Sequence, residues 1–138
     1  MKADAKSLDK LKGVHPELIK VVLEVFAETT VPFRVTYGVR TLEEEIEMIR
    51  KGLSSLKDPK DCRHVPTGYP PLGHAVDISI LDPAGKPVWS NQYIPAYIKV
   101  GELFQAASKK LRIPIRSGYL WKSFKDWGHH ELPAKYYP

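Results

Sequence analysis

The sequence has very little cysteine, because Cys62 is the only one among 138 residues. A single cysteine excludes a disulfide within the chain, and it also excludes structural zinc sites built from several thiolates, such as fingers and ribbons. Long apolar runs are missing too, since no stretch approaches the ~20 residues that a membrane-spanning helix needs. We therefore expect no stable insertion into a membrane.

Two further absences concern targeting and nucleic acid. The charged N-terminal residues Lys2, Asp4 and Lys6 are not followed by an apolar core, so we expect no secretory signal. The net charge of +5 favours polyanionic partners. However, the lysines and arginines are scattered, and no basic run alternates with aromatic residues. We therefore expect no binding to nucleic acid.

The length fits one domain, 1–138, in which the polar residues 1–14 are expected to form a loose N-terminal arm. Apolar residues at helical spacing predict helices from about 15 to 28, 41 to 52 and 93 to 111. Alternating and β-branched segments predict strands at 33–37, 75–81, 86–89, 113–116 and 129–132. The stretch 54–72, rich in proline and glycine, is typical of a loop. Because no βαβ rhythm is present, we predict an α+β fold with a small antiparallel sheet packed with about three helices.

The last predicted strand carries several groups with metal or acid–base chemistry. Because side chains alternate along a strand, His129 and Glu131 share one face and His130 takes the other. Asp126 precedes the strand at a Trp-Gly bend, which would place its carboxylate within reach of a metal-bound water, as a general base requires. The alternative is a surface edge strand with two solvated histidines.

A second stretch supplies the remaining candidate ligands. Asp77 lies within an otherwise apolar strand, where a carboxylate is costly to bury unless it is paired or bound to metal. The alternative is a buried aspartate that accepts backbone hydrogen bonds. His74 is an odd offset from Asp77 and so faces the other way, which favours His64 as the ligand and leaves His74 a supporting or substrate-facing role. A His-Asp-His set with a free carboxylate is typical of catalytic zinc sites.

Cys62 and Arg40 are two more candidates. The thiol could be a nucleophile paired with His64, a soft zinc ligand, or simply a small buried residue. Cys62 and His64 are only two positions apart, which is a poor arrangement for a nucleophile and its base. Arg40, in the turn after the first predicted strand, could bind a substrate carboxylate or stabilise an oxyanion, or it could cap the loop.

These motifs resemble the zinc D-Ala-D-Ala carboxypeptidase and L-alanyl-D-glutamate endopeptidase family, and most of all its phage endolysin branch. Cys62-Arg63-His64 corresponds to the family's Ser-x-His, and Gly73-His74-Ala75-Val76-Asp77 to Gly-x-Ala-x-Asp. The stretch from Asp126 to His129 matches Asp-x-x-His. Gly38-Val39-Arg40-Thr41 matches a Gly-x-Arg-Thr turn, and Gly118 to Trp121 matches Gly-x-x-Trp. Three features depart from the family pattern: Cys62 in place of serine, an insert at about 65–72, and Leu120 where many relatives have aspartate.

The resemblance implies a fold like that of the DD-carboxypeptidases and hedgehog domains, in a protein that we expect to be a monomer. It implies Zn²⁺ on His64, Asp77 and His129, with Asp126 as catalytic base and Arg40 as the substrate-binding residue. Supporting or substrate-binding roles are implied for Cys62, His74, Trp121 and Glu131.

The implied activity is hydrolysis of the L-Ala–D-Glu bond in peptidoglycan stem peptides. The alternatives are a D-Ala-D-Ala carboxypeptidase with the same site and a noncatalytic zinc-containing module that binds the cell wall. The resemblance also implies synthesis in the host cytoplasm and action on the wall after release through a holin.

Overall fold

The computed structural model describes residues 1–54 and 56–138. Ser55, in the predicted loop 54–72, lies outside the described residues. The helices are α1 (Ala5–Lys10), α2 (Pro16–Glu28), α3 (Leu42–Arg50) and α4 (Ile94–Leu111), with short 3-10 helices η1 (Pro59–Asp61), η2 (Asn91–Tyr93) and η3 (Gly118–Leu120). The strands are β1 (Phe33–Tyr37), β2 (Ala75–Leu81), β3 (Pro87–Val88), β4 (Arg116–Ser117) and β5 (His129–Glu131).

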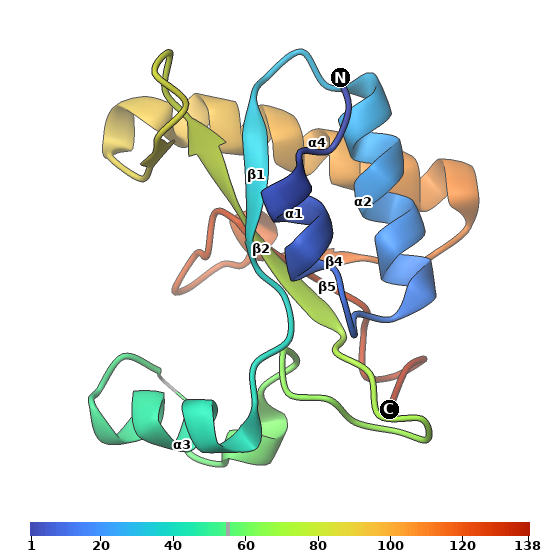
Figure 1. Cartoon of the computed structure of the whole chain (residues 1–138), viewed down its shortest axis with the longest axis vertical. Coiled ribbons are helices and arrows are strands. Elements are labelled where there is room, and N and C mark those ends of the chain that lie inside the picture. Colours follow the sequence, from blue (N-terminus) through green and yellow to red (C-terminus); the bar gives the residue numbers. More distant parts are fainter. Residues whose placement is uncertain (55) are drawn as a thin grey trace.

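The described strands form one antiparallel sheet in the order β1-β2-β5-β4, with β3 also paired to β2. Strand β2 is central, because β1 lies along one of its edges (Figure 1). Its other edge pairs with β5 at its N-terminal end and with β3 at its C-terminal end. The predicted α+β class with a small antiparallel sheet is therefore confirmed. The predicted strand at 113–116 is displaced to Arg116–Ser117, because Ile113 and Ile115 pack into the core instead.

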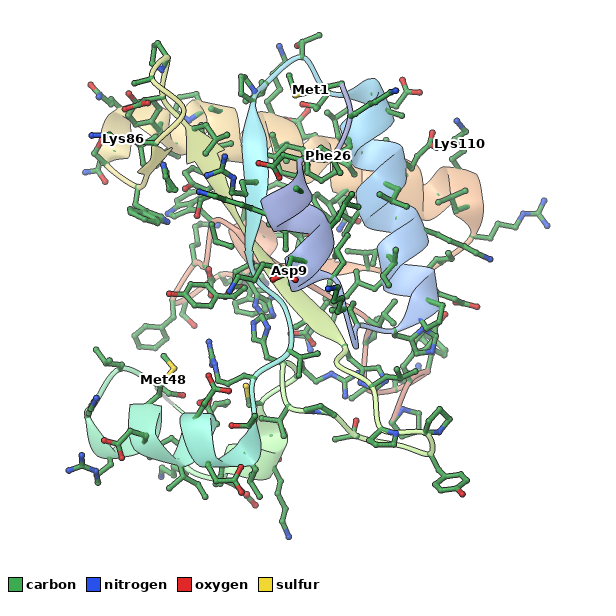
Figure 2. All side chains as sticks on the ribbon, viewed as in Figure 1. Met1, Asp9, Phe26, Met48, Lys86 and Lys110 are labelled. Carbon is green, nitrogen blue, oxygen red and sulfur yellow. The ribbon has the colours of Figure 1, made fainter. Side chains whose placement is uncertain are left out.

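The core lies between the sheet and the two longest helices, α2 and α4, which also pack on each other. The apolar stripe predicted for α2 is fully buried there, and Val76, Ile78 and Ile80 of β2 contribute the sheet side. Phe26 points into this core, stacked on Phe33, while Lys86 and Lys110 lie at the surface (Figure 2). This burial leaves the opposite face of β2, which carries Asp77, available for other chemistry.

The N-terminal segment folds as helix α1 and packs against β1 (Figure 1). Asp4 caps the helix, and the fully buried Ser7 accepts a hydrogen bond of 2.9 Å from the backbone N–H of Val35. Because this bond satisfies a donor on the outer edge of β1, α1 covers an edge that would otherwise be open to pairing. These residues therefore belong to the folded unit rather than to the loose arm that their polarity predicted.

Helix α3 and the loop after it project away from the main body (Figure 1). The helix begins at a capping box between Thr41 and Glu44. Its burial does not follow the apolar spacing that predicted the helix, because Ile46 is exposed, as is Leu53 just beyond the helix, while Glu45 is fully buried. The one fully buried side chain of α3 is thus a carboxylate, and it lines a cavity together with His64 and Asp77.

Candidate metal centre

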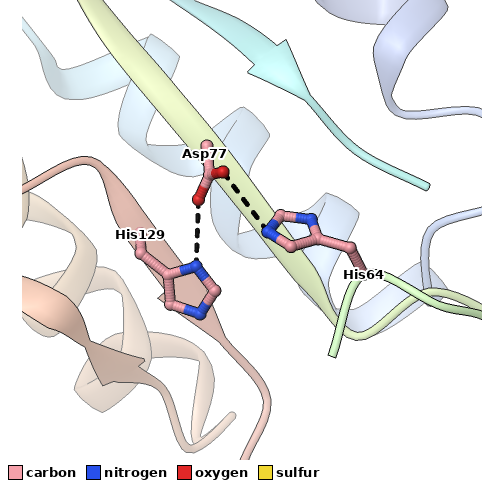
Figure 3. A group of neighbouring side chains, drawn as sticks. All are labelled: His64, Asp77 and His129. Atoms are coloured by element: carbon pink, nitrogen blue, oxygen red, sulfur yellow. Dashed lines mark hydrogen bonds and ion pairs between the residues drawn. The ribbon is translucent and has the colours of Figure 1, made fainter. Parts of the chain in front are cut away.

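Two neighbouring strands and one loop bring His64, Asp77 and His129 together (Figure 3). Asp77 of β2 lies directly opposite His129 of β5 in the strand register, and its Oδ1 is 2.9 Å from Nδ1 of His129. His64 follows η1 in the loop, and its Nε2 is 3.3 Å from the other oxygen of Asp77. The candidate donor atoms of all three residues lie within 4.8 Å of one another.

Each histidine uses its second ring nitrogen for support. Nδ1 of His64 is 2.8 Å from the carbonyl oxygen of Gly38, and Nε2 of His129 is 2.8 Å from a carboxylate oxygen of Glu131. A ligand histidine is usually held in this way, with one nitrogen turned to the metal and the other bound to a carbonyl or carboxylate. The donor set of two imidazoles and one carboxylate fits a catalytic zinc ion, which keeps a coordination position for water or substrate.

The electrostatics of the group also suit a cation. Burial by itself would raise the pKa of the Asp77 carboxyl. Hydrogen bonds from His129 and His64 outweigh this effect and hold that pKa well below its usual range. Burial opposes protonation of His129, yet the carboxylates of Asp77 and Glu131 raise its pKa to about 10. The two carboxylates therefore concentrate negative charge around the imidazole, and a divalent cation compensates such charge.

Asp126 lines the same cavity as His64, Asp77 and His129, and it lies just before the turn that leads into β5. A Cβ atom on Gly118 would be 2.2 Å from the carbonyl oxygen of Asp126, so only glycine permits this close approach. Gly128 likewise lies against the carbonyl of Ile78 in β2, where an added Cβ would be 2.2 Å from the oxygen. Burial and the nearby charge of Asp77 raise the pKa of the Asp126 carboxyl, which favours proton transfer near neutral pH.

Arg40 reaches the site from the turn after β1. Its Nη1 donates to Oε2 of Glu45 at 3.0 Å and lies 3.6 Å from Sγ of Cys62. Burial of Glu45 opposes ionisation, but hydrogen bonds from Ser54 and Arg40 lower the pKa of its carboxyl. Glu45 does not stand out in the sequence, where it is indistinguishable from the neighbouring acidic residues Glu43 and Glu44. Only the packing of α3 shows that this carboxylate orients Arg40.

Cys62 is buried and is not placed as a nucleophile. Burial raises the pKa of its thiol, which disfavours the reactive thiolate. The ring nitrogens of His64 face Gly38 and Asp77, so neither is directed at the sulfur as a general base. The interpretation of Cys62 and His64 as a cysteine-peptidase pair is therefore disfavoured by the geometry.

His74 and Trp121 lie on different sides of the group. The His74 ring is buried 5.6 Å from the ring of His15, and its Nδ1 is 3.3 Å from Thr67 Oγ1. It lies outside the cluster that holds His64, as the strand-face argument predicted. Trp121 lies with its ring 5.3 Å from that of His129 and lines the cleft beside it.

The carboxylate of Glu131 allows a first prediction. In the Glu131→Gln variant, zinc affinity should fall about 10–100-fold, because His129 loses the charge that makes its imidazole a stronger donor. Competition with a chromogenic chelator measures this affinity. Glu102→Gln on the exposed side of α4 is the matched control. Equal affinities in the two variants would remove Glu131 from the support of the site.

His130 allows a second prediction, on stability. Burial lowers the pKa of its fully buried ring to about 3, where it stacks on Phe104 and contacts Ser117. Since the unfolded chain takes up a proton below pH ~6.5 and the native state does not, acid destabilises the fold by about 1.4 kcal/mol per pH unit for this histidine. Between pH 6.5 and 4, the free energy of unfolding of metal-free His130→Leu protein should fall less steeply with decreasing pH than that of metal-free wild-type protein, by that amount. Equal dependence of the free energy of unfolding on pH in the two proteins would contradict the prediction.

The comparisons with known proteins agree with the geometry. The family model described as phage L-alanyl-D-glutamate peptidase matches residues 1–136. The L-alanyl-D-glutamate peptidase of Escherichia phage T5 is 31% identical over 123 residues, which cover 89% of this chain and 82% of that protein. The crystal structure of the Serratia marcescens L-Ala D-Glu endopeptidase ChiX has a TM-score of 0.83 and 32% identity, covering 100% of this chain and 94% of that one.

The resemblance inferred from the motifs is therefore confirmed over nearly the whole length of the sequence. The fold also agrees with that of the ChiX endopeptidase, since the structural match leaves no part of this chain uncovered. This chain belongs to the phage L-alanyl-D-glutamate peptidase family.

Proposed function

We propose that this protein is a zinc-dependent endopeptidase that cleaves the L-Ala–D-Glu bond of peptidoglycan stem peptides. The observation that carries the zinc assignment is the cluster of His64, Asp77 and His129, whose donor atoms converge within 4.8 Å. Bound there, zinc would supply Lewis acidity, which polarises the scissile carbonyl and brings deprotonation of water to about pH 7. Membership of the peptidase family supports the choice of bond.

The protein's own residues would carry the proton transfers. The Asp126 carboxylate accepts a proton from the attacking water and then donates it to the leaving amine nitrogen of D-Glu. Arg40, oriented by Glu45, binds the carboxylate of the substrate or the carbonyl oxygen that gains negative charge. Glu131 holds His129 in position throughout the reaction.

We further propose that the protein acts on the wall after release from the host cytoplasm. Among residues 1–54 and 56–138, no helix has both the length and the apolarity to cross a membrane. The positive net charge of +5 favours encounter with the anionic wall.

The test is metal content measured together with activity on purified peptidoglycan, before and after chelation. We expect one zinc per chain, loss of activity on chelation, recovery on adding zinc, and products with a new N-terminal glutamate by mass analysis. Released D-alanine would instead identify a D-Ala-D-Ala carboxypeptidase. Zinc without any product would favour a noncatalytic wall-binding module, and activity without metal would overturn the proposal.

A further inference from the structure

Two cavities meet at the candidate active site. One, of about 410 Å³, is lined by Arg40 and Arg63 and is called the arginine cavity here. The other, of about 450 Å³, is lined by Tyr37, Trp89, Phe124 and Trp127 and is called the aromatic cavity. Both include Tyr37, Asp77 and Asp126 in their linings, so they form one cleft that passes the site on both sides. The hydrolytic residues described above account for the arginine cavity, but they give no role to the exposed rings of the aromatic cavity.

The aromatic side chains around the second cavity are unusually open to solvent. Phe124 is 94% exposed, Trp89 is 68% exposed and Tyr37 is 57% exposed. Single exposed apolar residues need no explanation, but a group of exposed rings around one cavity indicates a binding surface. These rings come from β1, from the residue after β3 and from the loop before β5, so the fold gathers them from distant parts of the sequence.

Phe124 is also held in an unfavourable backbone conformation. Its φ of 51° lies in the left-handed region, which a bulky aromatic residue rarely adopts. The adjacent Lys125 fixes the loop, because its ammonium group donates to the carbonyls of Tyr119 and Trp121 at 3.0 and 2.9 Å. Strained backbone conformations of this kind concentrate at active sites and ligand-binding sites.

The two cavities differ in their linings, because guanidinium groups line only the arginine cavity and the exposed rings of Trp89 and Phe124 line only the aromatic one. In a stem peptide, the amino group of L-Ala is joined by an amide to the lactyl group of N-acetylmuramic acid. A neutral sugar therefore lies one residue from the scissile bond on the acyl side, while the free carboxylates lie on the D-Glu side. Arg40 suits the carboxylates, whereas Arg63 already donates to the backbone carbonyls of Leu132 and Tyr137. The exposed rings of the aromatic cavity suit the apolar faces of the sugar, and the polar side chains of Ser79 and Lys125 in the same lining suit its hydroxyl groups.

We propose that the aromatic cavity binds the N-acetylmuramyl sugar of the glycan strand, with Trp89 and Phe124 packing on its apolar C–H faces. This inference rests on the proposed function, because it assumes that the L-Ala–D-Glu bond lies at the junction of the two cavities. The L-Ala residue then spans the metal centre beside Asp126, and the stem peptide continues toward Arg40. The protein thus recognises the glycan and the peptide on opposite sides of the bond that it cuts.

The first test compares two substrates that differ only in the sugar: an N-acetylmuramyl stem peptide and the same peptide with an N-acetyl group instead. Wild-type protein should show a higher kcat/KM for the sugar-bearing substrate. In Trp89→Ala and Phe124→Ala, the ratio of the two kcat/KM values should fall about five- to thirtyfold, and Trp89→Tyr should restore much of it. The exposed Tyr136, which lines neither cavity, is the control as Tyr136→Ala. Equal kcat/KM values for both substrates in the wild type would overturn the proposal.

The second test does not depend on turnover. N-acetylmuramyl-L-alanine, the acyl-side product, is titrated into the zinc-loaded protein by calorimetry, with N-acetyl-L-alanine as the sugar-free comparison. We expect saturable binding of the sugar compound, weakened about five- to thirtyfold by Trp89→Ala or Phe124→Ala. Binding that is absent, or unaffected by both substitutions, would refute the sugar site. Sugar binding by a protein that cleaves no stem peptide would contradict the proposed function but would support the sugar site.

Discussion

His129→Ala is expected to lose stoichiometric zinc and to reduce peptidoglycan hydrolysis at least about a thousandfold. A Lewis acid contributes several kcal/mol of transition-state stabilisation, and about 4 kcal/mol corresponds to this factor. The variant should also be less stable than metal-free wild-type protein by about 1–3 kcal/mol, because Asp77 and Glu131 each lose one charged hydrogen-bond partner, although Asp77 keeps His64 and Glu131 keeps two arginines nearby. Metal analysis, activity assays and chemical denaturation measure the three effects.

The matched control is His74→Gln, which changes a buried histidine that lies outside the cluster. This variant should keep one zinc per chain and its hydrolytic activity. Zinc loss in His74→Gln together with zinc retention in His64→Gln would show that the ligand assignment from the geometry is wrong.

Asp126→Asn is expected to retain zinc but to lower kcat about 10²–10⁴-fold, the usual contribution of a positioned general acid–base group. Asparagine preserves the size of the side chain and its place in the turn against Gly118. It has no carboxylate to accept the proton of water or return it to the leaving amine. Single-turnover assays on a defined muropeptide, with zinc content measured in the same samples, separate a chemical defect from metal loss.

Asp9→Asn is the control, because Asp9 is an exposed aspartate paired with Lys12 on the surface. Its kcat should match that of the wild type. Loss of zinc in Asp126→Asn would make Asp126 a ligand instead of a base, and full activity in that variant would remove it from catalysis.

The alternation of side chains along the last strand is sufficient to separate the two adjacent histidines. His129 and Glu131 do share a face and are bonded to each other, while His130 lies in the core. The stripe of α2 is predicted correctly for the same reason, since periodicity is a local property of the chain. A carboxylate at Asp77 in an apolar strand also indicates the centre, because its burial is costly without a partner.

Local patterns fail where burial depends on distant segments. Helix α3 has apolar residues at helical spacing, yet Ile46 is exposed and Glu45 is buried against Arg40 and Cys62. Residues 1–14 are polar, but Ser7 is buried because it satisfies a backbone donor of β1. Neither arrangement can be inferred from the segment alone, since each depends on hydrogen bonds with partners elsewhere in the chain.

The sequence by itself determined the helices α2, α3 and α4, the central strands, the faces on which Asp77 and His129 lie, and the family to which the motifs belong. Only the tertiary structure decided that His64 reaches Asp77, that Glu45 holds Arg40, and that Tyr37, Trp89 and Phe124 surround one cavity. Side-chain periodicity is set by neighbouring dihedral angles and can be read from the chain. The site itself joins residues as far apart as Asp77 and His129, 52 positions, and such contacts form only when the whole sheet closes.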